Sequence, residues 1–254
     1  MNLTYHTIIV EREGAIGVIT LNRPQVLNAL SFDLVTEVDR AITGMEQDEA
    51  IKAIIVTGAG EKAFSAGADI HEMTQRPEGQ PESRGPSRLE QGWHMATCKK
   101  PTIGAINGLA FGGAALMSSL FDLRIGCERT RFRFLAAAYG RVNSTWSLPQ
   151  IVGWPIAKEL LYTGRVVEAE EALRIGLLNK LVPSAELMKA ALDMGKAIAA
   201  NNAKVVQGIK GMLIQDIGLS WREMLDNESQ TVTQSIGVPS PRDSFKDFLK
   251  RKGR

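Results

Sequence analysis

Short apolar runs separated by glycine-containing turns recur along the N-terminal part of the chain. The runs at 8–12 and 16–21 are rich in β-branched residues and flank Glu13-Gly14-Ala15, which predicts a β-hairpin. Three later runs, AIIVT at 53–57, TIGAI at 102–106 and LRIGC at 123–127, are almost continuously apolar. Such runs are typical of strands that are covered on both faces.

Helical periodicity begins at Ser31, which predicts an N-cap ahead of apolar positions close to 3.6 residues apart. Further helices are predicted at 113–121, 157–162 after Pro155, 168–175, 185–200, 204–217 and 221–235. The repeated order of buried strand, glycine turn and helix predicts an α/β fold with short, mixed strands. We expect an α/β core over 1–195 and a helical C-terminal region over 196–254.

Three segments indicate where the chain is mobile and whether it meets a membrane. Residues 75–88 contain three prolines, two glycines and no apolar residue, which predicts a mobile loop. The apolar stretch 109–121 is interrupted by glycines and serines, and it predicts a core helix too short to span a bilayer. The N-terminal residues lack the basic and apolar segments of a signal peptide. We therefore expect a cytoplasmic protein without a membrane partner.

Charge and cysteine usage exclude several other classes. The 254 residues include 30 basic and 28 acidic side chains, a net charge of +2 that does not suit neutralisation of nucleic-acid phosphates. Cys98 and Cys127 do not form a spaced pair, which argues against a zinc site or a disulfide framework. His6, His71 and His94 lack the spacing of a metal-binding face, so no metal is expected.

Nucleotide-binding motifs are incomplete. Gly58-Ala59-Gly60 lacks the third glycine of a dinucleotide fingerprint, and Lys62 is followed by alanine where a phosphate-binding loop needs serine or threonine. No serine occupies a Gly-x-Ser-x-Gly elbow. A nucleotide-binding α/β protein stays open as a minor alternative.

Two glycine-rich junctions carry more information together than singly. FSAGADI at 64–70 follows the strand at 53–57, and NGLAFGGA at 107–114 follows the strand at 102–106. Small residues allow a ligand close to the backbone, and two converging amides would form an oxyanion hole. The alternative for either junction alone is tight strand–helix packing without a ligand.

The ordered set of motifs resembles the crotonase (enoyl-CoA hydratase/isomerase) superfamily. The matching segments are LNRP at 21–24, NAL at 28–30, FSAGADI, KKPTIGAINGLAFGG at 99–113, LPQIVG at 148–153 and TGRVVEAEEALRIGLLNKLV at 163–182. The resemblance extends from about residue 7 to residue 250. It implies a spiral of ββα units with a C-terminal helical trimerisation region.

The resemblance also implies a ligand and an assembly. The substrate would be an acyl-CoA thioester, with coenzyme A present as part of the substrate and no permanently bound cofactor. A homotrimer or a hexamer formed from two trimers is expected. The C-terminal helix has more apolar positions than one neighbouring element can cover, which agrees with an interface there. These positions are Val205, Val206, Ile209, Met212, Leu213 and Ile217.

Site residues follow from the matching positions. The amides of Ala68 and Gly113 match the oxyanion-hole donors for the thioester oxygen, and Asp69 is expected to cap the helix after Ala68. Besides Ala68, Asp69 and Gly113, the positions expected to contact substrate are Val26, Leu27, Ala66, Ile70, Gly112, Leu116 and Ala136.

This chain departs from the family pattern where hydratases carry their two glutamates. Leu116 occupies the first position and Ala136 the second, and the loop around Gly140–Ser144 is shortened. Addition of water needs a group that orients and deprotonates it. Tyr139 and Asn143 are the foremost replacement candidates, ahead of His94, Glu78 and Glu82.

Three functions therefore stay open. The first is nominal enoyl-CoA hydratase or isomerase activity through enolate stabilisation, which the missing glutamates would slow. The second is another thioester-enolate reaction, such as decarboxylation of a malonyl-type thioester. The third is a non-catalytic acyl-CoA binder or regulator.

Overall fold

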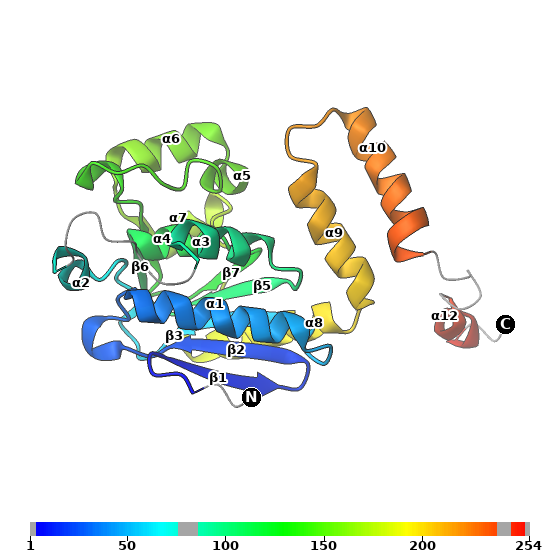
Figure 1. Ribbon diagram of the computed structural model, residues 1–254, viewed down its shortest axis with the longest axis horizontal. Helices are drawn as coiled ribbons and strands as arrows, with labels where there is room; N and C mark the ends of the chain where they lie inside the picture. The colour runs from blue at the N-terminus through cyan, green and yellow to red at the C-terminus, as the bar shows by residue number, and fades with distance from the viewer. Residues whose placement is uncertain (1–3, 76–85, 238–244, 252–254) are drawn as a thin grey trace. The chain divides into compact units, whose positions relative to one another are not determined.

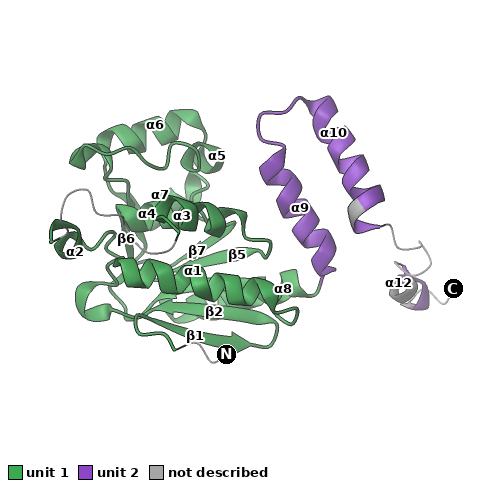
Figure 2. Ribbon diagram, in the orientation of Figure 1, with its two compact units in different colours: residues 1–200 green, residues 201–254 purple. Residues whose placement is uncertain are grey.

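The computed structural model describes residues 4–75, 86–237 and 245–251 (Figure 1). Its contacts divide the chain into two compact units, Met1–Ala200 and Asn201–Arg254 (Figure 2). The predicted boundary between residues 195 and 196 falls inside helix α8 (Leu187–Ala199), which belongs to the first unit.

A six-stranded sheet forms the centre of the first unit. Its strands lie in the order β1 (Ile8–Glu13), β2 (Ile16–Leu21), β3 (Ala53–Gly58), β5 (Thr102–Ile106), β7 (Leu123–Gly126) and β10 (Lys180–Leu181). The β1–β2 hairpin is antiparallel and the other neighbours are parallel. The predicted hairpin and the three predicted buried strands are confirmed.

Both faces of this sheet are covered, which explains the almost continuous apolar runs. Ile54 and Val56 of β3 belong to one buried cluster, which includes residues of α1 (Phe32–Gln47). Ile55 between them belongs to another, which contains Leu187 and Ala191 of α8. Successive strand residues point to opposite faces of the sheet. A strand that is covered on both faces therefore shows no alternation of polar and apolar residues.

A second sheet corrects the prediction of one helix over 109–121. Its strands lie in the order β4 (Ala63–Ser65), β6 (Leu109–Phe111), β8 (Arg131–Arg133) and β9 (Val167–Glu168). Residues 109–111 thus form strand β6, and helix α4 (Gly113–Ser118) starts only after Gly112, whose φ is +53°. A backbone with positive φ interrupts a right-handed helix, so strand and helix are separate elements.

The predicted helix over 113–121 also ends earlier than expected, at Ser118. Ser118 Oγ donates to Ala114 O at 2.8 Å and Ser119 Oγ to Leu116 O at 2.7 Å. Beyond the helix, the buried Arg124 guanidinium donates to Ser118 O and Phe121 O. Side chains therefore provide donors for the carbonyl groups at the end of the helix.

The helices predicted from Ser31 and at 157–162, 168–175 and 185–200 are confirmed to within a few residues, whereas the helices at 88–97 and 148–152 have no counterpart among the predictions. The N-cap of α1 is Ser31, whose hydroxyl accepts from Leu34 N at 3.2 Å. The remaining helices are α2 (Ile70–Thr74), α3 (Arg88–Thr97), α5 (Leu148–Val152), α6 (Trp154–Thr163) and α7 (Ala169–Arg174). Of the predicted loop 75–88, residues 76–85 lie outside the described residues, and Arg88 already belongs to α3.

The second unit is helical in its described residues. It contains α9 (Ala203–Gln215), α10 (Trp221–Gln230), a π-helical segment (Thr231–Ile236) and α12 (Lys246–Arg251). Ile209 and Leu213 on α9 are 49% and 72% exposed. Within the described part of the chain, no helix is long and apolar enough to cross a membrane.

Candidate active site

The two glycine-rich junctions meet at the ends of neighbouring strands. Strands β4 and β6 are parallel, so the segments that follow them leave the same edge of the sheet. A Cβ placed on Gly113 would lie 3.3 Å from Ala68 N. Because a Cβ lies about 2.5 Å from its own backbone nitrogen, the nitrogens of Ala68 and Gly113 are within about 6 Å of each other. Two donors at this separation can share one oxygen atom.

Neither amide has an acceptor among the described residues, although their neighbours do. Gly112 N donates to Arg133 O at 2.8 Å, and Asp69 N donates to Leu30 O at 3.2 Å. Gly113 is the first residue of α4, where a helix offers no internal acceptor for the amide. The two N–H groups are therefore available to a ligand.

Asp69 caps the N-terminus of α2 and is hydrogen-bonded to Arg23. Its carboxylate accepts from Glu72 N at 3.3 Å, which confirms the predicted cap. It also accepts from Arg23 Nη1 at 2.8 Å. This bond to Arg23, together with the amide of Glu72, lowers the pKa of Asp69 below its ordinary value despite partial burial. Asp69 is thus an ionised structural group.

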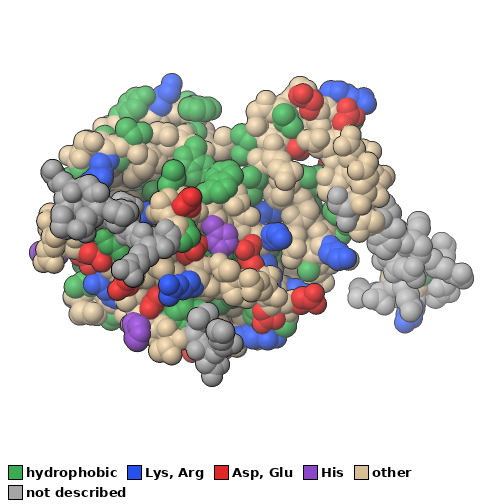
Figure 3. All heavy atoms as spheres, viewed as in Figure 1, with side chains coloured by type: hydrophobic (Ala, Val, Ile, Leu, Met, Phe, Trp, Pro, Cys, Tyr) green, Lys and Arg blue, Asp and Glu red, His purple; other side chains and the backbone are tan. Residues whose placement is uncertain are grey.

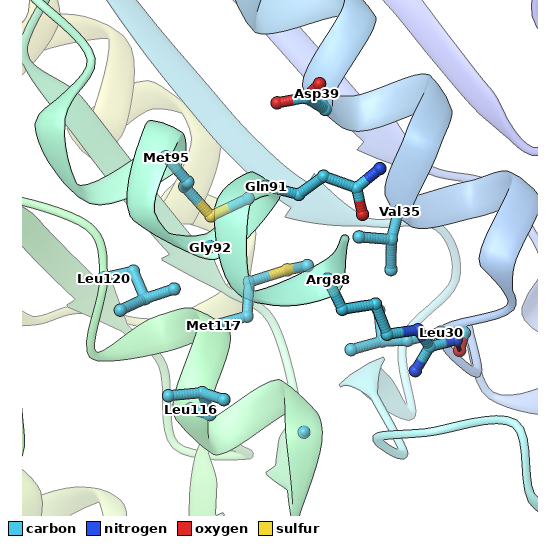
Figure 4. Close-up of a pocket in the computed structure, with 11 residues that line it drawn as sticks. Leu30, Val35, Asp39, Arg88, Gln91, Gly92, Met95, Leu116, Met117 and Leu120 are labelled. Atoms are coloured by element: carbon cyan, nitrogen blue, oxygen red, sulfur yellow. Dashed lines mark hydrogen bonds between the residues drawn. The ribbon is translucent and has the colours of Figure 1, made fainter. Parts of the chain in front are cut away.

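An apolar cavity of about 110 Å³ lies between α1, α3 and α4 and reaches Gly113 (Figure 4). Its lining residues are Leu30, Val35, Asp39, Arg88, Gln91, Gly92, Met95, Gly113, Leu116, Met117 and Leu120. Leu116 thus presents an aliphatic side chain where related hydratases are expected to carry a glutamate. Ala136 is buried and does not belong to this lining.

The residues expected to contact coenzyme A lie at the surface beside the first junction. Val26, Leu27 and Ile70 are 41%, 36% and 60% exposed, so their apolar side chains can contact a ligand from solvent. Ala66 is also exposed, and its amide donates to Leu27 O at 2.9 Å. Leu27 also lines a second cavity of about 300 Å³, together with Lys62.

Tyr139 and Asn143, the predicted replacement acids, do not line the apolar cavity. Tyr139 is 66% exposed, and Asn143 Oδ1 accepts from the neighbouring Ser144 Oγ at 3.1 Å. Their catalytic role stays a prediction, and Glu78 and Glu82 lie outside the described residues.

A charged cluster behind the cavity was not anticipated. His94 on α3 has Nδ1 2.6 Å from Asp39 Oδ1 and Nε2 2.9 Å from Glu46 Oε2, both on α1. Burial alone would lower the pKa of His94, but the bonds and charges of Glu46 and Asp39 outweigh it and raise that pKa. The seven-residue spacing of Asp39 and Glu46 places them on one helix face. Only the packing of α3 reveals that this face meets His94.

No cluster suited to a metal ion occurs within residues 4–75, 86–237 and 245–251. Cys98 and Cys127 are both buried. Basic and acidic side chains are interspersed on the visible face (Figure 3), in keeping with the small net charge. A strongly basic surface of the kind that binds nucleic acid is therefore not part of that face.

Comparison with known proteins agrees with this geometry. The enoyl-CoA hydratase/isomerase family model matches residues 11–253. A crotonyl-CoA hydratase of Syntrophomonas wolfei is 36% identical over 253 residues, covering 98% of this chain and 97% of the relative. A short-chain-enoyl-CoA hydratase of Clostridium acetobutylicum is 33% identical over 97% of this chain and 96% of the relative.

Solved structures point the same way. The crystal structure of an enoyl-CoA hydratase from Bacillus anthracis superposes with a TM-score of 0.86 at 29% identity, covering 97% of both chains. The family model, the two relatives and the crystal structure each match nearly the whole sequence. This chain therefore belongs to the enoyl-CoA hydratase/isomerase family and has the crotonase fold.

Proposed function

We propose that this protein binds acyl-CoA thioesters and stabilises a thioester enolate with the amides of Ala68 and Gly113. The observation that carries the proposal is the pair of amides without protein acceptors, within about 6 Å of each other and beside an apolar cavity. The thioester oxygen would accept from both amides. The acyl chain would enter the cavity past Gly113.

Two fixed donors favour the state in which negative charge has moved onto the thioester oxygen. Removing one donor of this kind typically slows catalysis about 10²–10³-fold. Two hydrogen bonds constrain the backbone that holds the donors. Gly112 N donates to Arg133 O at 2.8 Å, and Leu30 N donates to Gly67 O at 2.7 Å. The donors are therefore in place before the substrate arrives.

The acyl group is expected to be short. A dry protein cavity of about 150 Å³ holds a benzene molecule. The cavity beside Gly113 is smaller, at about 110 Å³, which suits an acyl chain of roughly four or five carbons. The exposed apolar side chains of Val26, Leu27 and Ile70 would contact the pantetheine arm and the rest of coenzyme A.

Efficient hydration is not expected of this site. Adding water to an enoyl thioester requires a base for the water and an acid for the α-carbon, each contributing roughly 10²–10⁴-fold. Leu116 can serve as neither, and it presents its side chain to the cavity. Ala136 is only 9% exposed and has no polar side-chain atom. An aliphatic wall also excludes the water that the reaction consumes.

The test combines binding with turnover. Crotonyl-CoA and a panel of short acyl-CoA thioesters are titrated by calorimetry, and products are followed by mass spectrometry. We expect binding together with hydration far below about 10 s⁻¹, an ordinary enzyme rate. The absence of binding to any CoA thioester would refute the proposal. Hydration at an ordinary rate would refute the expectation that this site hydrates enoyl thioesters slowly. Binding without turnover of any thioester would favour the non-catalytic alternative.

Gly113→Pro tests the oxyanion pair directly. Proline is tolerated at the first helical position, where it removes the amide donor and adds a Cβ that would lie 3.3 Å from Ala68 N. We expect any turnover found in the panel to fall about 10²–10³-fold. Ala203→Pro, at the first helical position of α9 and outside the cavity lining, is the control for a general effect of the substitution.

We also propose assembly into a homotrimer or a hexamer through the second unit. The support is the exposure of Ile209, Leu213 and Ile217 on and just after α9, at 49%, 72% and 55%. Exposed apolar stripes of this kind mark interfaces. A monomeric mass by light scattering at micromolar concentration would contradict this assembly.

A further inference from the structure

We infer that Gln91 recognises a hydroxyl group at the end of the acyl chain, so that the preferred ligands are CoA thioesters of short ω-hydroxy acids. The inference rests on the proposed acyl-CoA site and names its substrate class. Gln91 belongs to α3, and its side chain lines the same cavity as Gly113 and Leu116 (Figure 4). The residue is buried, with only 4% of its surface exposed.

The amide group of Gln91 is held at its nitrogen and open at its oxygen. Nε2 donates to Thr36 Oγ1 at 3.3 Å, which holds the amide against α1. Oε1 accepts no hydrogen bond from the described residues. In Figure 4 this oxygen is turned toward Val35 and Arg88, which also line the cavity. A buried acceptor without a donor is unfavourable, so a ligand that supplies the donor gains affinity there.

The other two polar side chains of the lining carry charges that are engaged with protein groups. Asp39 Oδ1 lies 2.6 Å from His94 Nδ1. The guanidinium of Arg88 lies 3.9 Å from the carboxylate of Glu72. The remaining lining residues are apolar or glycine. The neutral amide of Gln91 is therefore the group suited to an uncharged polar atom of the ligand.

The chemistry of the cavity limits which donor fits. A hydroxyl group has a proton that it can donate to an amide oxygen, and it is uncharged. A carboxylate has no proton to donate, and an ammonium group would bring a charge into a mostly apolar cavity. A methyl group suits the apolar walls but leaves Gln91 Oε1 without a donor. A hydroxyl is therefore the substituent that this site favours.

The place of Thr36 along α1 indicates which acyl carbon carries the hydroxyl. The thioester end lies beside Leu30, whose Cδ1 would be 3.5 Å from a Cβ on Gly113. Thr36 is five residues beyond the N-cap Ser31, about 7.5 Å along the helix. An extended chain advances about 1.2 Å per bond. A hydroxyl on C4, with a hydrogen bond of about 2.8 Å, therefore reaches about 7.5 Å from the thioester carbon.

A comparison of 4-hydroxybutyryl-CoA with pentanoyl-CoA tests the inference, because the two acyl chains have the same length and differ only in a terminal hydroxyl or methyl group. Both are titrated by calorimetry, and mass spectrometry verifies that the thioester is intact before and after each titration. We expect the wild-type protein to bind 4-hydroxybutyryl-CoA about five- to tenfold more tightly, as expected for one hydrogen bond between neutral groups.

Substitutions assign this preference to the amide. Gln91→Met has a side chain of similar length without the amide, and it should abolish the preference. Thr36→Val removes the bond that holds the amide against α1, and it should weaken the preference. Gln150→Met, at an exposed position on α5 outside the cavity lining, is the control and should keep the preference of the wild-type protein.

The possible results separate the two proposals. Binding of neither thioester to the wild-type protein refutes the proposed acyl-CoA site itself. Equal or tighter binding of pentanoyl-CoA overturns the role of Gln91, and so does a preference that survives Gln91→Met. If Gln91→Met fails to fold, Gln91→Asn draws the amide back by one carbon, and an unchanged preference in that variant also contradicts the inference. Tighter binding of 3-hydroxybutyryl-CoA than of 4-hydroxybutyryl-CoA would overturn the assignment of the hydroxyl to C4.

Discussion

Gly67→Ala should disturb the oxyanion pair without removing any donor. The backbone of Gly67 has φ +96°, a conformation that residues with a Cβ rarely adopt. The added Cβ would lie 2.4 Å from Phe111 O and 3.0 Å from Gly113 N. Both atoms belong to the backbone, so they cannot move aside as the end of a flexible side chain would. The substitution therefore forces the two junctions apart.

The expected loss of stability has two parts. A left-handed backbone costs a residue with a Cβ about 1–2 kcal/mol. Overpacking adds about 1–3 kcal/mol. The sum of about 2–5 kcal/mol lowers the melting temperature by roughly 4–20 °C in a protein of this size. Because Gly113 N itself is displaced, any turnover should fall as far as it does when one donor is lost, about 10²–10³-fold.

Gly14→Ala is the matched control. Gly14 has φ +63°, and a Cβ there would meet no atom within 4 Å, so only the backbone cost of about 1–2 kcal/mol applies. Melting is followed by scanning calorimetry, and ligand binding by titration with crotonyl-CoA. The reasoning is refuted if Gly67→Ala melts no lower than Gly14→Ala and binds the thioester with wild-type affinity.

Three further predictions concern other parts of the molecule. The pKa of His94 is raised above its ordinary value of 6.5, so the stabilisation from its positive charge beside Asp39 and Glu46 is fully present below about pH 6.5 and is lost as the pH rises through the folded-state pKa. His94→Gln should thus lower the melting temperature by about 2–6 °C at pH 6, and by less at pH 9; an equal loss at both pH values would contradict this. Leu116→Glu combined with Ala136→Glu should raise crotonyl-CoA hydration at least tenfold, measured by loss of the enoyl absorbance, at some cost in stability; an unchanged rate would show that these positions do not face the substrate. Leu213→Glu should shift the light-scattering mass towards the monomer, because it places a charge in the proposed interface; a mass equal to that of wild type would exclude α9 from the interface.

The sequence by itself determined the elements whose signals are local. The hairpin, the buried strands and the helix capped by Ser31 follow from hydrophobic periodicity and from polar caps, which act over a few neighbouring residues. The glycine junctions could also be located, because closely packed backbones demand small residues wherever they occur. The family resemblance depended on the order of these motifs along the chain.

Only the tertiary structure decided which of these residues meet. The sequence predicts that residues 109–111 belong to a helix, but they pair with β4 and β8 and form a strand. Pairing with distant strands outweighs the intrinsic propensity of a three-residue segment. The proximity of Ala68 N to Gly113 likewise depends on the pairing of β4 with β6. Arg88 and His94 belong to a helix that packs against α1, and a pattern along one helix cannot specify the side chains of its neighbour. Periodicity fixes which face of an element is buried, whereas the contacts that give that face its chemistry form between residues distant in sequence.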